Sequence, residues 1–139
     1  MSEYLLDANV IVRFLTLDDP KQSKAAKKLI LKAQTGDVVL HLDASIVAEV
    51  VYVLESSRYG KSRQDIHDAL IDFLGNPCIE TAAGDIVADA LKRFKERPAL
   101  DFADCWLAAQ AGAKKLEVAS FDRDLDKFKD ITRYEPEET

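Results

Sequence analysis

The sequence predicts one α/β domain over residues 1–139, in which a central, mostly parallel sheet is covered by helices on both faces in three α/β/α layers. Two observations support this fold class. Short apolar runs typical of buried strands alternate with longer amphipathic segments typical of helices along the whole chain. No glycine-rich linker or internal repeat interrupts this alternation, and 139 residues suit a single domain.

Composition narrows the class of protein. Apolar residues make up 47% of the chain and charged residues 32%, which favours a compact fold over disorder. The chain has no apolar stretch of the ~18 residues that a membrane span needs and no charged leader, so we expect a cytoplasmic protein. The net charge of −6 argues against general binding to nucleic acid.

Cys78 and Cys105 lack the spacing of a zinc site, and we expect buried free thiols.

The first half of the chain opens with a strand and continues mainly with helices. Residues 4–6 predict a short buried strand, and apolar residues recur at helical spacing from Val10 to Leu15. In the turn Asp18-Asp19-Pro20, the proline is placed to begin a helix, which Gly36 ends. We then expect a strand over 37–42, a helix over 44–57 capped by Asp43, and a helix over 63–74.

The second half continues the same alternation. Asn76-Pro77 breaks the chain before an expected strand over 78–81 and a helix over 85–96. Another helix begins near Asp101, and residues 116–119 predict the last strand. Each later strand is thus reached through helices, which is the order of a parallel sheet.

Two aspartates follow expected strands, where an open α/β sheet places its ligand crevice. Asp7 follows the first strand and Asp122 the last, although Asp7 also suits a helix cap and Asp122 a turn. Asn9 is an alternative cap beside Asp7. Ser120 offers a hydroxyl that can order a carboxylate or a metal-bound water, and Asp124 competes with Asp122 for its role.

Two helices carry the other acids of interest. Glu49 lies in an almost entirely apolar helix, where a carboxylate is costly to bury unless it is paired, metal-bound or directed into a cleft. The alternative is that Glu49 lies on a narrow exposed stripe. Asp101 and Asp104 share one face of their helix. A cap or the helix dipole explains Asp101, but it explains Asp104, one turn inside the helix, less well.

Together these positions predict a cluster of carboxylates without histidine or cysteine beside them. Hard oxygen ligands of this kind select Mg²⁺ or Mn²⁺, and the ion relieves the repulsion between the acids. A bound ion lowers the pKa of a water and neutralises charge on a phosphate. The implied chemistry is hydrolysis of a phosphate ester.

Four segments, in this order, resemble the PIN-domain ribonucleases, and most closely the toxins of VapBC-type toxin–antitoxin systems. They are Leu6 to Phe14 with Asp18-Asp19-Pro20, the Glu49 helix, Asp101 to Asp104, and Ser120 to Asp124. The resemblance implies a Mg²⁺- or Mn²⁺-dependent endoribonuclease that cuts single-stranded or loop RNA. By position, its metal-binding acids are Asp7, Glu49, Asp104 and Asp122, supported by Asn9, Asp101, Ser120 and Asp124.

The resemblance also implies partners. It implies an RNA substrate, a homodimer, and a small antitoxin that blocks the site and represses the shared operon together with the toxin, so that operator DNA is contacted only through that complex. We expect phosphate contacts from five basic residues: Arg13, Lys21, Lys24, Lys28 and Arg58. The alternative for the lysines is an ordinary solvated helix face.

Three other functions fit the sequence less well. A haloacid-dehalogenase-like phosphatase needs Asp-x-Asp, and this chain has Asn9 at the second position. A receiver domain needs a phosphorylatable aspartate after a central strand, and residues 78–82 contain none. A degenerate PIN module, which binds RNA or a protein partner without catalysis, should lack at least one of the four acids, and all four are present.

Overall fold

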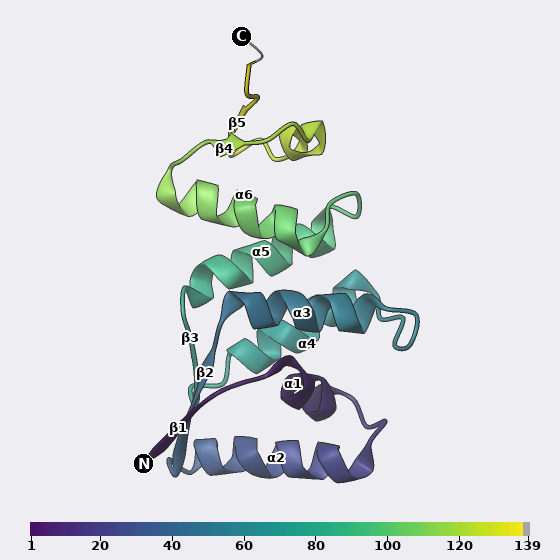
Figure 1. Cartoon of the computed structure of the whole chain (residues 1–139), viewed down its shortest axis with the longest axis vertical. Helices are drawn as coiled ribbons and strands as arrows, with labels where there is room; N and C mark the ends of the chain where they lie inside the picture. Colours follow the sequence, from purple (N-terminus) through teal and green to yellow (C-terminus); the bar gives the residue numbers. More distant parts are fainter. Residues whose placement is uncertain (138–139) are drawn as a thin grey trace. The chain divides into compact units, whose positions relative to one another are not determined.

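The computed structural model describes residues 1–137 and consists of two compact units (Figure 1). The first unit runs from Met1 to Gly84, and the second begins at Asp85. Both units mix helices with parallel strands.

The first unit is a parallel three-stranded sheet with helices between its strands. Its elements are β1 (Ser2–Leu5), α1 (Ala8–Leu15), α2 (Pro20–Gln34), β2 (Val38–Leu42), α3 (Ala44–Glu55), α4 (Arg63–Leu74) and β3 (Ile79–Thr81). The strand order is β1-β2-β3, with Leu5 opposite His41 and His41 opposite Glu80. Leu40 and Leu42 of β2 are buried. Because the strands are parallel, their carboxyl ends meet at one edge, and Asp7 follows β1 at that edge.

Side-chain caps place the starts of two helices where the sequence predicts them. The carboxylate of Asp19 accepts a 3.0 Å hydrogen bond from the backbone N–H of Gln22, and Pro20 occupies the first position of α2. The carboxylate of Asp43 accepts a 2.9 Å hydrogen bond from the backbone N–H of Ser45 in α3. The predicted starts of both helices are confirmed.

The first strand is not buried, contrary to the sequence prediction. All four residues of β1 are exposed, including Tyr4 and Leu5, whereas Leu6 just beyond the strand is buried. The reason is that β1 lies at the edge of the first unit's sheet and pairs only with β2. An apolar run in the sequence does not distinguish an edge strand from a central one.

The second unit has two helices followed by a pair of two-residue strands. Its elements are α5 (Gly84–Glu96), α6 (Phe102–Lys114), β4 (Val118–Ala119), the 3-10 helix η1 (Arg123–Lys127) and β5 (Arg133–Tyr134), with β4 and β5 parallel. Phe94 and Phe102 pack edge to face in its core, with ring centroids 6.2 Å apart. Arg93 of α5 donates to both carboxylate oxygens of Asp130 and lies over the ring of Phe128. These contacts fix the segment after η1 to α5.

Cys105 is buried and Cys78 is half-buried. Cys105 therefore agrees with the prediction of a buried thiol, and Cys78 agrees in part. Among residues 1–137, every helix is too short or too polar to span a bilayer.

Candidate functional site

Asp7 lies between β1 and α1 and does not use its side chain as a cap. Its backbone has the extended angles of an N-cap residue, φ −87° and ψ 154°, but the side chain makes no capping hydrogen bond. Its side chain is exposed, as is that of Asn9 in the first turn of α1. The carboxylate of Asp7 is therefore available for another role.

Glu49 lies on an exposed stripe of α3. Its neighbours Val47 and Val50 are buried, whereas Glu49 and Tyr52, one turn later, are exposed. The alternative that Glu49 lies on a narrow exposed stripe is thus confirmed, and its carboxylate stays hydrated. Because α3 packs against α1, the first unit carries Asp7 and Glu49 on neighbouring elements.

The first turn of α6 holds two carboxylates in different roles. Asp101 is the N-cap, and its Oδ1 accepts a 2.9 Å hydrogen bond from the backbone N–H of Asp104. Asp104 is half-buried inside the helix. Capping therefore accounts for Asp101, whereas Asp104 has no capping role.

The surroundings of Asp104 raise its pKa from 3.8 to about 6. Partial burial is the largest cause because it removes water from the charged form, and the charges of Asp101 and Asp122 add repulsion. Hydrogen bonding between the side chains of Asp101 and Asp104 favours a proton there as well. The second unit thus brings these three acids close enough to influence one another.

Backbone hydrogen bonds fix Asp122 in the turn after β4. Oγ of Ser120 accepts a 3.0 Å hydrogen bond from the N–H of Asp122, and Oδ1 of Asp122 accepts one of 2.9 Å from the N–H of Asp124. Asp122 therefore acts as a turn residue, and this uses one of its two carboxylate oxygens. The carboxylate of Asp124 lies 3.4 Å from Nζ of Lys127, so Asp124 forms an ion pair with that lysine.

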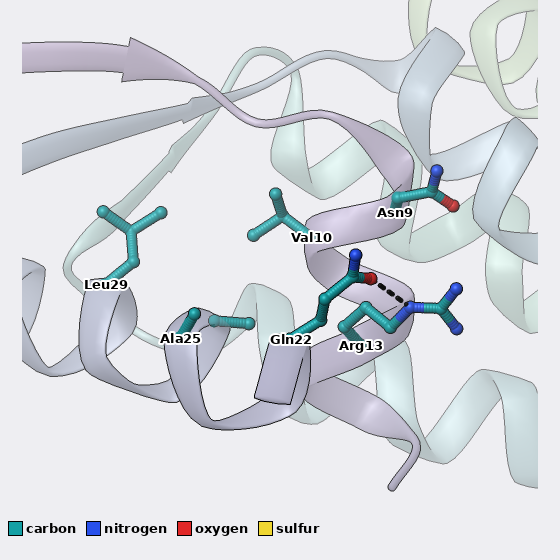
Figure 2. A pocket seen from close by; sticks show the side chains of 7 residues that line it. Asn9, Val10, Arg13, Gln22, Ala25 and Leu29 are labelled. Atoms are coloured by element: carbon teal, nitrogen blue, oxygen red, sulfur yellow. Dashed lines mark hydrogen bonds between the residues drawn. The ribbon is translucent and has the colours of Figure 1, made fainter. Parts of the chain in front are cut away.

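A groove of about 390 Å³ lies between α1 and α2, next to Asn9 (Figure 2). Its apolar lining consists of Val10, Ala25, Ala26 and Leu29. Arg13 and Gln22 supply polar groups, and Nε of Arg13 donates a 2.8 Å hydrogen bond to Oε1 of Gln22. The groove combines an apolar surface with side chains that can pair with polar groups of a ligand.

Asp18 forms a hydrogen-bonded hub that the sequence analysis missed. Its carboxylate accepts hydrogen bonds from the hydroxyl of Tyr59 at 2.6 Å and from the guanidinium groups of Arg58 and Arg13 at 2.9 and 3.1 Å. The bond from Tyr59, and then that from Thr16, hold the pKa of Asp18 well below its usual range. No sequence pattern marks this hub, because Tyr59 and Asp18 are 41 residues apart.

The hydrogen bonds to Asp18 determine how readily Arg13 and Arg58 can bind a phosphate of RNA. The side chain of Arg13 is 17% exposed and bonded to Asp18, Gln22 and Tyr59, so a phosphate has to displace one of these partners. Arg58 is 64% exposed and keeps donors facing solvent. The expected phosphate contacts of both residues stay predictions.

The lysines of α2 form an exposed stripe. Lys21, Lys24 and Lys28 are all exposed, as are Lys27 and Lys32, and α2 contains no acid. None of the five forms an ion pair within residues 1–137. At 1.5 Å per residue the stripe from Lys21 to Lys32 is about 16 Å long. The stripe is therefore a positive surface without an acid on its own helix.

The acids fit a divalent cation by their chemistry. In neither unit do three His, Cys, Asp or Glu side chains within residues 1–137 adopt the arrangement of a metal site. Asp101, Asp104 and Asp122 are nevertheless hard oxygen donors, and their mutual influence contributes to the raised pKa of Asp104. A cation bound to them relieves this repulsion.

Comparison with known proteins gives one family. A family model described as PIN domain matches residues 4–131. The match begins within β1 and ends between η1 and β5, so it includes parts of both units. Together with the parallel β1-β2-β3 sheet it confirms the three-layer α/β/α fold class. A search of curated proteins gives no match.

Proposed function

Since this chain belongs to the PIN-domain family, whose fold is a nuclease fold, we propose that it is a divalent-metal-dependent endoribonuclease. The observation that carries the proposal is the position of Asp104, whose pKa is raised to about 6 by burial and by the charges of Asp101 and Asp122. A half-buried acid perturbed by other acids is typical of catalytic and metal-binding positions. The alternative is a PIN module that binds RNA or a protein partner without cleaving RNA.

We assign Mg²⁺ or Mn²⁺ to the carboxylates of Asp7, Glu49, Asp104 and Asp122. When bound, the metal supplies a water of lowered pKa and neutralises charge on the scissile phosphate. The free carboxylate of Asp7 and the exposed carboxylate of Glu49 support their part in this set.

Four further residues support the assigned ligands. Asp101 holds the backbone of Asp104, Ser120 holds the backbone of Asp122, and the N–H of Asp124 fixes one oxygen of Asp122. Asn9 places an exposed amide two residues after Asp7. Through these hydrogen bonds, Asp101, Ser120 and Asp124 position the proposed ligands Asp104 and Asp122.

The metal assignment requires that the two units belong to one domain, which we propose for residues 1–139. The continuous family match over residues 4–131 supports it. We also propose that the protein acts in the cytoplasm, where its RNA substrate is found.

The RNA backbone is proposed to lie along the lysines of α2. Lys21, Lys24 and Lys28 are exposed and unpaired within residues 1–137, which favours them as phosphate contacts. Arg58 contributes through its exposed donors, and Arg13 contributes where a phosphate replaces Asp18. The basic stripe provides local attraction for RNA although the chain has a net charge of −6.

We propose further that the protein is the toxin of a VapBC-type pair, a homodimer held inactive by a small antitoxin and bound to operator DNA only through that complex. The groove between α1 and α2 supports an antitoxin segment with apolar side chains, because its lining is mostly apolar. Asn9 lies at this groove and two residues from Asp7, so a segment bound there lies near the proposed site.

The proposal is tested by incubating the purified protein, freed from any bound partner, with a mixed RNA pool. Cleavage should require Mn²⁺ or Mg²⁺, stop with EDTA, and fall at least about 100-fold in Asp104→Asn. The matched control is Asp85→Asn, which replaces an exposed aspartate in the first turn of another helix. Metal-independent cleavage, or full activity of Asp104→Asn, contradicts the nuclease assignment. RNA binding without cleavage favours the non-catalytic module.

A further inference from the structure

Phe121 differs from every other phenylalanine of the chain. The chain has six phenylalanines, and the other five make ring contacts: Phe14 with Phe73, Phe94 with Phe102, and Phe128 with Arg93. Phe121 is 71% exposed and has no ring partner within residues 1–137. The ring of Phe121 is therefore accessible to a ligand at the surface of the second unit.

The loop that carries Phe121 is fixed on both sides of the ring. Before it, the N–H of Ser120 donates a 3.0 Å hydrogen bond to the carbonyl of Tyr134, and the carbonyl of Ser120 accepts one of 3.0 Å from Nη1 of Arg133. After it, the N–H of Asp122 donates to Oγ of Ser120 at 3.0 Å. A ligand that packs on this ring therefore meets a backbone that is already ordered and loses little conformational entropy.

Phe121 directly precedes one of the proposed metal-binding acids in the chain. Asp122 is the next residue in the chain, and its charge reaches Asp104. A phosphate bound at these acids brings the bases of its two nucleotides close to the loop. Unpaired bases commonly stack on exposed aromatic side chains, and every base offers a flat face for this contact.

We propose that Phe121 is a substrate-binding residue that stacks on an unpaired base next to the scissile phosphate. This inference rests on the proposed ribonuclease function. Because the phenyl ring has no hydrogen-bonding group, it selects for an unstacked base and not for a particular sequence. Phe121 thereby favours single-stranded or loop RNA over a duplex, whose bases are held in the helical stack.

The test compares Phe121→Leu, which keeps an apolar side chain without a ring, with Phe121→Trp, which keeps an aromatic ring. On a short single-stranded RNA, Phe121→Leu should raise KM about tenfold with little change in kcat, and Phe121→Trp should stay close to wild type. Removing the base on one side of the cleaved bond should raise KM of the wild type but not of Phe121→Leu. Equal KM values for all three proteins, or equal effects of the missing base, overturn the proposal.

A binding measurement separates this inference from the nuclease assignment. RNA that carries the fluorescent base 2-aminopurine is titrated into Asp104→Asn and into the same variant with Phe121→Leu. Quenching that depends on the ring supports stacking even if the wild type cleaves nothing, in which case only the nuclease assignment fails. Ring-independent quenching, or no binding, overturns the stacking. A smaller particle mass for Phe121→Leu with unchanged RNA binding assigns the ring to a contact between copies and also overturns it.

Discussion

The backbone N–H of Asp104 donates a 2.9 Å hydrogen bond to Oδ1 of Asp101, so the two acids in the first turn of α6 have separate roles. Asp101 caps the helix, and Asp104 keeps a half-buried carboxylate with a raised pKa. Both residues are aspartates at the start of a helix. Asp101 stabilises the helix, whereas Asp104 is proposed to bind the catalytic metal.

Substitutions at Asp101 should distinguish the effect of its helix-capping hydrogen bond on stability from the effect of its charge on the pKa of Asp104. Asp101→Ala should lower the free energy of unfolding by about 1 kcal/mol because the cap is lost. Asparagine is as good an N-cap residue as aspartate, so Asp101→Asn should leave the free energy of unfolding nearly unchanged. Asp101→Asn should also lower the pKa of Asp104, since it removes one of the repelling charges. Urea denaturation and NMR titration of the Asp104 carboxyl measure the two effects. Equal stability of the Ala and Asn variants contradicts the capping role.

The raised pKa of Asp104 should make the metal-free protein less stable as the pH rises. The folded state holds the Asp104 proton more tightly than the unfolded chain, so the stabilisation is complete below pH 3.8 and is lost as the pH rises through about 6. Asp104→Asn should remove this pH dependence and stabilise the metal-free protein at pH 7.5 by about 1 kcal/mol, a figure reduced for solvent screening. Thermal melts from pH 4 to 8 in EDTA measure it. A less stable variant at pH 7.5 contradicts the repulsion.

The hub at Asp18 should stabilise the first unit. Tyr59→Phe removes the hydroxyl that donates to Asp18 and accepts from Arg13, and it should lower the melting temperature by several degrees. Tyr52→Phe is the matched control, since the exposed Tyr52 has no hydrogen-bond partner within residues 1–137. The pKa of Asp18 is lowered, so its contribution is complete above pH 3.8 and is lost as the pH falls below that value. Equal melting of both Tyr variants contradicts this role.

The lysine stripe of α2 should account for part of the salt dependence of RNA binding. Changing Lys21, Lys24 and Lys28 to glutamine should reduce the slope of log K against log salt by about 2, given ~0.7 per phosphate contact on a single strand. The same change at Lys114, Lys115 and Lys129 in the second unit keeps the net charge matched and should leave the slope unchanged. Equal slopes for both triple variants indicate that the stripe is an ordinary solvated face.

Local signals in the sequence predicted most elements of the fold. Pro20, the cap Asp43 and the breaker Gly36 mark helix ends that depend on neighbouring residues only, and α2 and α3 begin where these signals place them. By contrast, β5 consists of Arg133 and Tyr134 and has no apolar alternation to reveal it. Its pairing with β4 depends on hydrogen bonds to a distant segment, which no local pattern encodes.

The candidate site was predictable to a similar extent. The carboxyl ends of strands identified Asp7 and Asp122 as acids of interest, and the first turn of α6 identified Asp104. The sequence did not indicate that Asp7 leaves its capping bond unmade while Asp101 and Asp122 make theirs, because all three are aspartates before a helix. It also did not indicate that Arg13 is occupied by Asp18 and Tyr59, contacts that depend on how helices pack.

The most direct test of the central claim is a titration of the RNA-free protein with Mn²⁺. Binding is monitored in electron paramagnetic resonance through the loss of the signal of the free ion. Wild type and Asp85→Asn should bind Mn²⁺ alike, and Asp104→Asn should bind it at least about tenfold more weakly. That result places a divalent ion at the acids of the second unit without depending on the identity of the RNA target. Equal Mn²⁺ affinity of Asp104→Asn and wild type contradicts the proposed metal site.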